Sequence, residues 1–172
     1  RAAIGIMRSA FGLQGQKCSA NSRIFVERPV KEAFTERLLE FTRKLVVGDP
    51  THRTVYLGPV INAGAYRDFS LFTEELSGAG DILHGGKQLV EGDLAHGYYC
   101  EPTIVDNVPM EHRLWKHEML LPITMIHAVD SLDEAMRLAN DVNYGLTAGF
   151  YGSKDEANWF FDHIEAGVTY AN

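Results

Sequence analysis

The chain contains only two cysteines, Cys18 and Cys100, and this scarcity excludes a framework of disulfides. The two residues form no C-x-x-C pair, so a reducing compartment is the expected environment. Uninterrupted apolar runs are also short, well below the ~20 residues that a membrane-spanning helix needs. The N-terminus lacks the pattern of a signal peptide. We therefore predict a cytoplasmic location and no membrane partner.

Positive charge is scarce as well. The sequence has 16 basic and 23 acidic residues, a net charge of -7, and lysine and arginine never occur in runs longer than two. This balance argues against a nucleic-acid partner and against an anionic membrane surface. An apolar fraction of 45% and a charged fraction of 23% are typical of a globular protein. The length of 172 residues suits one domain with a substantial core.

The two ends of the sequence lack the usual signals of an element boundary. The chain begins "RAAIGIMRSAFG", where apolar residues recur at helical spacing with no starting methionine and no N-capping residue. It ends "EAGVTYAN", which is typical of a strand that has just begun. We therefore expect the 172 residues to be a fragment of a longer chain.

Strands and helices are predicted to alternate along the chain. Segments rich in β-branched or apolar residues favour strands, and apolar residues at i+3/i+4 spacing favour helices. The predicted strands cover residues 22–27, 81–86, 98–108, 121–129, 146–152 and 168–172, and the predicted helices cover 30–47, 62–77, 132–141 and 154–167. This alternation implies βαβ units, so we predict an α/β fold with three layers, α/β/α, around a mostly parallel sheet.

Several of these helices carry boundary signals. Gly78 is placed to end the second helix. Ser131 with Glu134 predicts a capping box at the start of the third helix, and Ser153 with Glu156 predicts another at the start of the fourth. In sheets of this kind, functional residues gather at the carboxyl ends of the strands.

Cys18 lies in the polar, glycine-broken stretch "FGLQGQKCSAN". A single cysteine is more often a buried small hydrophobe than a nucleophile. Its neighbours are polar, however, and positive charge at Lys17 would favour a thiolate if that side chain pointed toward the sulfur. The direction of Lys17 is not readable from the sequence, so composition alone supports the two interpretations equally. Cys100, between tyrosines and a strand in "YYCEPTIV", fits a structural role.

Metal-binding patterns are not evident among the seven histidines. His112 and His117 are five residues apart, which matches neither a helical pair of ligands nor a zinc finger, and we predict no metal site. A Cys18–histidine pair of the protease kind has no local signature and stays open. Glu118 directly precedes an apolar strand, so it is either a salt-bridged or capping glutamate or an acceptor for sugar hydroxyls. No G-x-G-x-x-G pattern is present, so a complete cofactor pocket is not predicted.

A set of ordered motifs gives the chain a family resemblance. The motifs, in order, are "GQKCSANSRIFV", "LGPVI", "GYYCEPTIV", "HEMLLPI" and "ANDVNYGLTAGFY". Together they resemble the catalytic domain of the aldehyde dehydrogenase superfamily over essentially all 172 residues. Within that superfamily, "FGLQGQKCSANSR" looks most like the 1-pyrroline-5-carboxylate dehydrogenase branch, which oxidises glutamate 5-semialdehyde to glutamate.

The resemblance implies roles for four residues. Cys18 matches the family's nucleophile, which forms a thiohemiacetal and then a thioester while NAD or NADP accepts hydride. Its backbone N–H matches one oxyanion donor. Ser19 matches a position that binds the substrate carboxylate, and Glu118 matches the glutamate that binds the nicotinamide ribose. Leu120 replaces the aromatic residue beside the nicotinamide, because "EMLLP" stands where the family usually has E-x-F-G-P.

The resemblance also implies that other parts of the machinery lie elsewhere. In the family, the general-base glutamate, a second oxyanion donor and the dinucleotide-binding domain all precede the position of Arg1. We therefore expect a nucleophile-bearing domain that is inactive alone, from a homo-oligomeric enzyme acting on a small aldehyde in proline catabolism. Two alternatives remain open: a non-catalytic relative, suggested by "EMLLP", and a CoA-acylating semialdehyde dehydrogenase.

Overall fold

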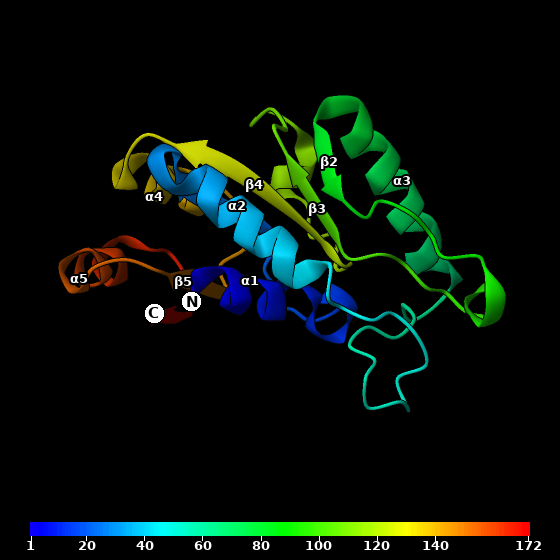
Figure 1. Cartoon of the computed structure of the whole chain (residues 1–172). Helices are drawn as coiled ribbons and strands as arrows, with labels where there is room; N and C mark the ends of the chain where they lie inside the picture. Colours follow the sequence, from blue (N-terminus) through cyan, green and yellow to red (C-terminus); the bar gives the residue numbers. More distant parts are fainter.

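A four-stranded sheet lies at the centre of the computed structural model, which describes residues 1–172 (Figure 1). Its strands follow the order β1-β4-β3-β2. They span Arg23–Glu27 (β1), Ile123–Val129 (β4), Thr103–Asp106 (β3) and Asp81–His84 (β2). β4 pairs in parallel with both β1 and β3, and β2 pairs antiparallel with β3 at the edge. The predicted mostly parallel sheet is confirmed, with its most apolar strand at the centre, where both faces are buried.

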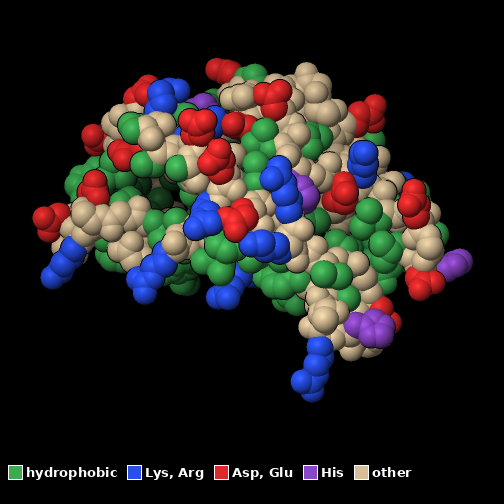
Figure 2. Space-filling model, viewed as in Figure 1, with side chains coloured by type: hydrophobic (Ala, Val, Ile, Leu, Met, Phe, Trp, Pro, Cys, Tyr) green, Lys and Arg blue, Asp and Glu red, His purple; other side chains and the backbone are tan.

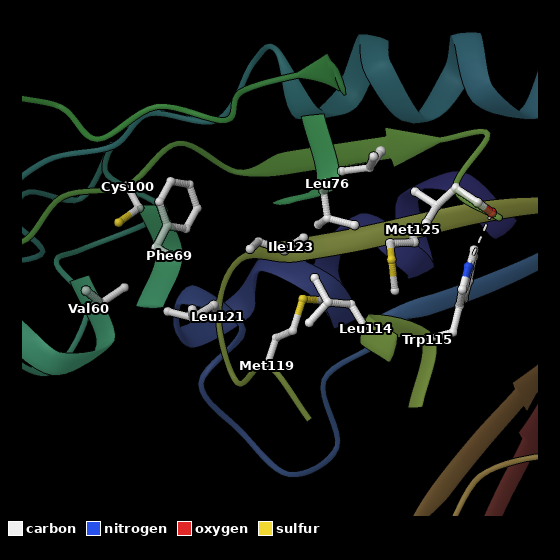
Figure 3. Packing of buried hydrophobic residues seen from close by; sticks show 12 residues of the cluster. Val60, Phe69, Leu76, Cys100, Leu114, Trp115, Met119, Leu121, Ile123 and Met125 are labelled. Carbon is white, nitrogen blue, oxygen red and sulfur yellow. Dashed lines mark hydrogen bonds between the residues drawn. The ribbon is translucent and has the colours of Figure 1, made fainter. Parts of the chain in front are cut away.

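Helices cover both faces of this sheet. On one side lie α1 (Ala2–Phe11) and α2 (Arg28–Thr42), and on the other lies α3 (Ala63–Ala79) (Figure 1). Neighbouring strand residues belong to different cores because successive side chains of a strand point to opposite faces. Ile126 packs in the cluster with α1 and α2, whereas Met125 packs in the cluster with α3 that Figure 3 shows. These two cores confirm the predicted three layers.

The last third of the chain forms a smaller unit beside the main sheet. After α4 (Leu132–Asn140), β5 (Thr147–Phe150) pairs in parallel with β6 (Val168–Ala171), and α5 (Lys154–His163) connects them. The two strands were predicted, but they form a separate sheet rather than extending the first. In Figure 1 this unit lies next to α1, with the two chain ends close together. None of the helices is long and apolar enough to cross a bilayer.

Three helix ends differ from their predictions, and one of them is that of α5, which ends at His163 rather than at residue 167. α3 does not end at Gly78 but continues to Ala79, and Gly80 follows it. A Cβ on Gly80 would lie 2.5 Å from the carbonyl oxygen of Asp106, whereas a Cβ on Gly78 would meet nothing within 4 Å. α2 ends at Thr42 rather than at residue 47, because the chain leaves the helix there and Val47 forms a bridge with Leu57.

The two predicted capping boxes also differ from each other. At α5 both bonds are made: the Ser153 hydroxyl accepts from the Glu156 N–H, and the Glu156 carboxylate accepts from the Ser153 N–H. At α4 the Ser131 hydroxyl accepts from the Glu134 N–H at 3.2 Å, but the Glu134 carboxylate accepts from the N–H of Asp130. The second box is therefore only half formed.

Candidate active site

The loop that carries Cys18 follows an unusual reversal of the backbone. Leu13, Gln14 and Gly15 all have positive φ values, 54°, 57° and 67°. Gly15 is required here for a second reason, because a Cβ on it would lie 2.6 Å from the carbonyl carbon of Leu121. This backbone contact places the Cys18 loop directly against the segment that contains Glu118, more than 100 residues away in sequence.

Hydrogen bonds hold the Cys18 loop on both sides of the thiol. Before it, the Gln16 side-chain oxygen accepts from the N–H of Ile61 at 3.0 Å. After it, the Asn21 side-chain oxygen accepts from the Thr124 hydroxyl of β4, also at 3.0 Å. Cys18 itself lies in a turn and is exposed. The thiol is therefore carried by a loop that is fixed to the sheet and open to solvent.

Lys17 has a direction in the structure that the sequence did not reveal. Its side chain extends back over Gly12 at the start of the loop. A Cβ added to Gly12 would lie 3.5 Å from the Lys17 ammonium nitrogen. The side chain is half-buried and takes part in none of the chain's ion pairs. Lys17 is therefore an unpaired positive charge within the same loop as the thiol.

Cys100 is the opposite case. It is 2% exposed and belongs to the core against α3 that Figure 3 shows. Burial raises the pKa of its thiol to about 12, so the thiol is protonated at neutral pH. This environment agrees with the predicted structural role of Cys100.

The segment that carries Glu118 follows the short helix Arg113–Lys116, and its residues alternate between exposed and buried from Glu118 to Leu121. Trp115 and Met119 are buried, whereas Glu118 is exposed. The Glu118 carboxylate belongs to none of the ion pairs of the chain. Leu120 follows with a positive φ of 52° and is 45% exposed, and Leu121 is buried again. The observed environment disfavours the salt-bridged interpretation of Glu118.

All four predicted site residues line one cleft of about 330 Å³: Cys18, Ser19, Glu118 and Leu120. The sequence motifs alone did not show that these residues meet. Their meeting depends on the parallel pairing of β1 with β4, because Cys18 and Ser19 precede β1 while Glu118 and Leu120 precede β4. The site therefore lies at the amino ends of these two strands, and not at the carboxyl ends where functional residues were predicted to gather.

Other residues of the cleft were missed by sequence analysis. Tyr144, Tyr151 and Tyr170, from the small β5–β6 unit, line the same cleft as Cys18. Periodicity in their segments indicated strands, but it carried no information about which surface those strands would face. Tyr151 also lies over Gly5 of α1, so it contacts the main domain directly.

A second, apolar cavity of about 290 Å³ adjoins the cleft. It lies between α4, α5 and β1, and Figure 2 shows hydrophobic side chains around a hollow at that end of the molecule. Five residues line both spaces: Ile6, Phe25, Ala139, Tyr151 and Ile164. The cleft therefore has a polar part near Cys18 and an apolar wall shared with the second cavity.

The residues of the cleft fit one part of a dinucleotide. An exposed, unpaired carboxylate such as that of Glu118 can accept hydrogen bonds from the vicinal hydroxyls of a ribose. The chain has no glycine-rich phosphate-binding pattern. A ribose is therefore a group that the carboxylate of Glu118 could hold in the cleft that also contains the exposed thiol of Cys18.

Comparison with known proteins gives consistent matches over the whole chain. The model of the aldehyde dehydrogenase family matches residues 1–172. An α-ketoglutaric semialdehyde dehydrogenase of Bacillus subtilis is 34% identical over 99% of this chain and 36% of its own length. A 1-pyrroline-5-carboxylate dehydrogenase of Bacillus licheniformis is 37% identical over 99% of this chain and 33% of its own length.

Solved structures agree with these matches. A 1-pyrroline-5-carboxylate dehydrogenase from Thermus with bound NAD superposes with a TM-score of 0.92 at 36% identity. The match covers 99% of this chain and 32% of that one. The chain thus spans about a third of the length of the relatives it matches.

Proposed function

Because this chain belongs to the aldehyde dehydrogenase family, we propose that it is the nucleophile-bearing catalytic domain of a longer NAD(P)-dependent aldehyde dehydrogenase. The observation that carries the proposal is the single cleft lined by Cys18, Ser19, Glu118 and Leu120. The chain covers about a third of its relatives, so the remaining catalytic groups are expected outside these 172 residues. The isolated chain is accordingly expected to be inactive.

In the proposed reaction, the Cys18 thiolate attacks the carbonyl carbon of the aldehyde. A C–S bond forms and the carbonyl oxygen becomes an oxyanion, which the backbone N–H of Cys18 stabilises. The chemistry that NAD(P) supplies when bound is acceptance of the hydride from the tetrahedral carbon. Loss of hydride from that carbon would restore the carbonyl as a thioester on Cys18, and water would then cleave the C–S bond to give the carboxylic acid and the Cys18 thiol. The loop bonds at Gln16 and Asn21 support this role because they hold the thiol in one place.

Glu118 and Leu120 are proposed to contact the cofactor. The Glu118 carboxylate has no partner within the chain, so its oxygens are free to accept from ribose hydroxyls. Leu120 is 45% exposed, lines the same cleft, and would offer an aliphatic surface to the nicotinamide where the family usually has an aromatic ring. Both groups lie in the same cleft as the thiol, as hydride transfer requires.

The proposed substrate is glutamate 5-semialdehyde. Ser19, next to the nucleophile, supplies a hydroxyl that can donate to the carboxylate of such a substrate. Two relatives are named 1-pyrroline-5-carboxylate dehydrogenase and α-ketoglutaric semialdehyde dehydrogenase. These names support a substrate whose aldehyde lies at the opposite end of the molecule from a carboxylate. α-Ketoglutaric semialdehyde is therefore the second candidate substrate.

The test of the nucleophile uses the full-length enzyme. Cys18→Ser is expected to reduce aldehyde-dependent NADH formation by at least ~10³-fold, because an alcohol is a much weaker nucleophile than a thiolate. Cys100→Ser is the matched control and should keep most of the activity, since Cys100 lies in the core outside the cleft. Normal NADH formation by Cys18→Ser would overturn the proposal.

A second assay distinguishes among the candidate aldehyde substrates, and between water and CoA as the acceptor of the acyl group. We expect kcat/KM to be highest for glutamate 5-semialdehyde, with α-ketoglutaric semialdehyde next and simple aliphatic aldehydes lower. Ser19→Ala should lower kcat/KM for the carboxylated aldehydes by about 10-fold, and leave the aliphatic ones unchanged. Formation of an acyl-CoA in the presence of CoA would instead identify the CoA-acylating alternative.

A further inference from the structure

Glu118 makes no hydrogen bond or ion pair of its own, so its position depends on its neighbours in the chain. On its C-terminal side, Met119 is 6% exposed and packs in the core against α3. On its N-terminal side, His117 is exposed and has no place in that core. Leu114 and Trp115 anchor the start of the preceding segment in that core, so only the exposed residues between Trp115 and Met119 depend on surface contacts.

The aromatic ring of Phe72 on α3 provides one such contact. The His117 ring meets the Phe72 ring edge-on, with 5.3 Å between ring centroids. The Arg113 guanidinium lies over the same ring, 5.6 Å from its centroid. One half-buried side chain of α3 thus touches both ends of the five-residue stretch from Arg113 to His117.

The carboxylate of Glu75, one turn further along α3, provides the second contact. It accepts two hydrogen bonds from the Arg113 guanidinium, one of them from Nε at 2.8 Å, in a bidentate pair. The Nε2 atom of His112 lies 3.3 Å from the same carboxylate. His112 Nδ1 in turn accepts from the N–H of Leu114, which caps the short helix at Arg113–Lys116.

We propose that Phe72 and Glu75 are positioning residues for the cofactor: through Arg113, His112 and His117 they hold Glu118 where it binds the nicotinamide ribose. This inference rests on the proposed function. The Glu75 carboxylate is 32% exposed and Arg113 is 55% exposed, and exposed ion pairs contribute little to global stability. The effect of this ion pair is therefore local, on the geometry of residues 112–118, whereas Phe72 also packs against the core.

The test measures NAD binding to the full-length enzyme by titration calorimetry, together with KM for each substrate. Phe72→Leu is expected to raise Kd for NAD by about 5-fold, and Glu75→Gln by about 3-fold. Glu74→Gln is the matched control, because Glu74 is exposed on the same helix and belongs to no ion pair. KM for the aldehyde and the alkylation rate of Cys18 should stay unchanged in all three variants.

A double-mutant cycle then asks whether Phe72 acts through Glu118. Glu118→Gln alone should weaken NAD binding, and adding Phe72→Leu to it should cause no further loss. Additive losses, or normal NAD binding by both Phe72→Leu and Glu75→Gln, would overturn the inference while leaving the proposed function standing. If Glu118→Gln itself binds NAD normally, the proposed cofactor role of Glu118 fails, and the inference fails with it. If Phe72→Leu does not fold, Glu75→Gln replaces it in the cycle, since it alters only an exposed carboxylate.

Discussion

At the scale of single residues, the two cysteines of this chain differ in their exposure to solvent and in what surrounds them. Cys18 is exposed on a loop held by side-chain hydrogen bonds, whereas Cys100 is buried and burial raises its pKa to about 12. The thiolate is the reactive form, and it must also be reachable. The two environments therefore predict a large difference in chemical reactivity.

Alkylation with iodoacetamide near neutral pH measures that difference. We expect Cys18 to react at least ~10²-fold faster than Cys100, as followed by mass spectrometry of digested protein. In concentrated denaturant the two rates should converge, because the core around Cys100 is then lost. Comparable rates in the native protein would favour the non-catalytic alternative for this chain.

The glycines of the Cys18 loop give a second prediction at this scale. Gly15→Ala is expected to destabilise the chain by about 2–4 kcal/mol, because alanine is strained at φ 67° and its Cβ would collide with the backbone of Leu121. Gly12→Ala is the control: its φ is -58° and its nearest neighbour would be at an ordinary 3.5 Å. Urea unfolding of both variants measures the change, and equal losses would contradict the assigned role of Gly15.

At the scale of elements, periodicity predicted which segments form helices and strands, but local sequence did not determine every boundary. Every predicted strand and helix overlaps an observed one. Gly78 was predicted to end α3 because glycine is the usual helix terminator. The observed end depends instead on Gly80, whose close approach to Asp106 of β3 is a tertiary contact. Such contacts have no signature in the sequence of the helix itself.

This difference between Gly78 and Gly80 is directly testable. Gly78→Ala should stabilise the chain by about 0.5–1 kcal/mol, because alanine favours the helix interior and its Cβ would meet nothing. Gly80→Ala should destabilise it by about 1–3 kcal/mol, because its Cβ would lie 2.5 Å from the Asp106 carbonyl oxygen. The thermal unfolding temperature should therefore rise in Gly78→Ala and fall in Gly80→Ala. A rise in Gly80→Ala would contradict the observed packing.

The cleft itself shows the same limit of sequence analysis. Motif resemblance identified Cys18, Ser19, Glu118 and Leu120 one by one, and the structure brings all four to one cleft. Tyr144, Tyr151 and Tyr170 of the same cleft were not identified, because their place depends on how the small β5–β6 unit packs beside α1. Tyr144 and Tyr151 lie within the motif "ANDVNYGLTAGFY", but the resemblance gave them no role, so belonging to a motif did not reveal that their side chains face the cleft.

At the scale of the whole molecule, two half-buried histidines in the sheet should make the free energy of unfolding depend on pH. Desolvation lowers the pKa of His127 on β4 and of His84 on β2, so the fold favours their neutral forms. The groups facing His127 are Glu134 and Asp106, which favour its charge, and Lys31 and Arg28, which oppose it. Burial outweighs the carboxylates at this position.

The sign of the pH dependence follows from these lowered pKa values. In the unfolded chain histidine takes up a proton near pH ~6.5, but the folded chain resists protonation until a lower pH. The free energy of unfolding should therefore be greatest above pH ~7 and fall as the pH decreases through ~6.5. Exposed carboxylates with lowered pKa values, such as Asp130, reduce the free energy of unfolding only below pH ~4.5, where they begin to take up protons. The interval between about pH 6.5 and 5 thus isolates the histidines.

Urea unfolding across that interval provides the measurement. His127→Gln should flatten the dependence, because glutamine keeps a polar side chain and does not titrate, and His84→Gln should flatten it further. His52→Gln is the control, since His52 is exposed and lies outside the sheet. A slope that persists in the His84→Gln/His127→Gln double variant would place the titrating group elsewhere. In the proposed full-length enzyme the same loss would affect the candidate site, because β4 carries both His127 and the Thr124 hydroxyl that holds the Cys18 loop.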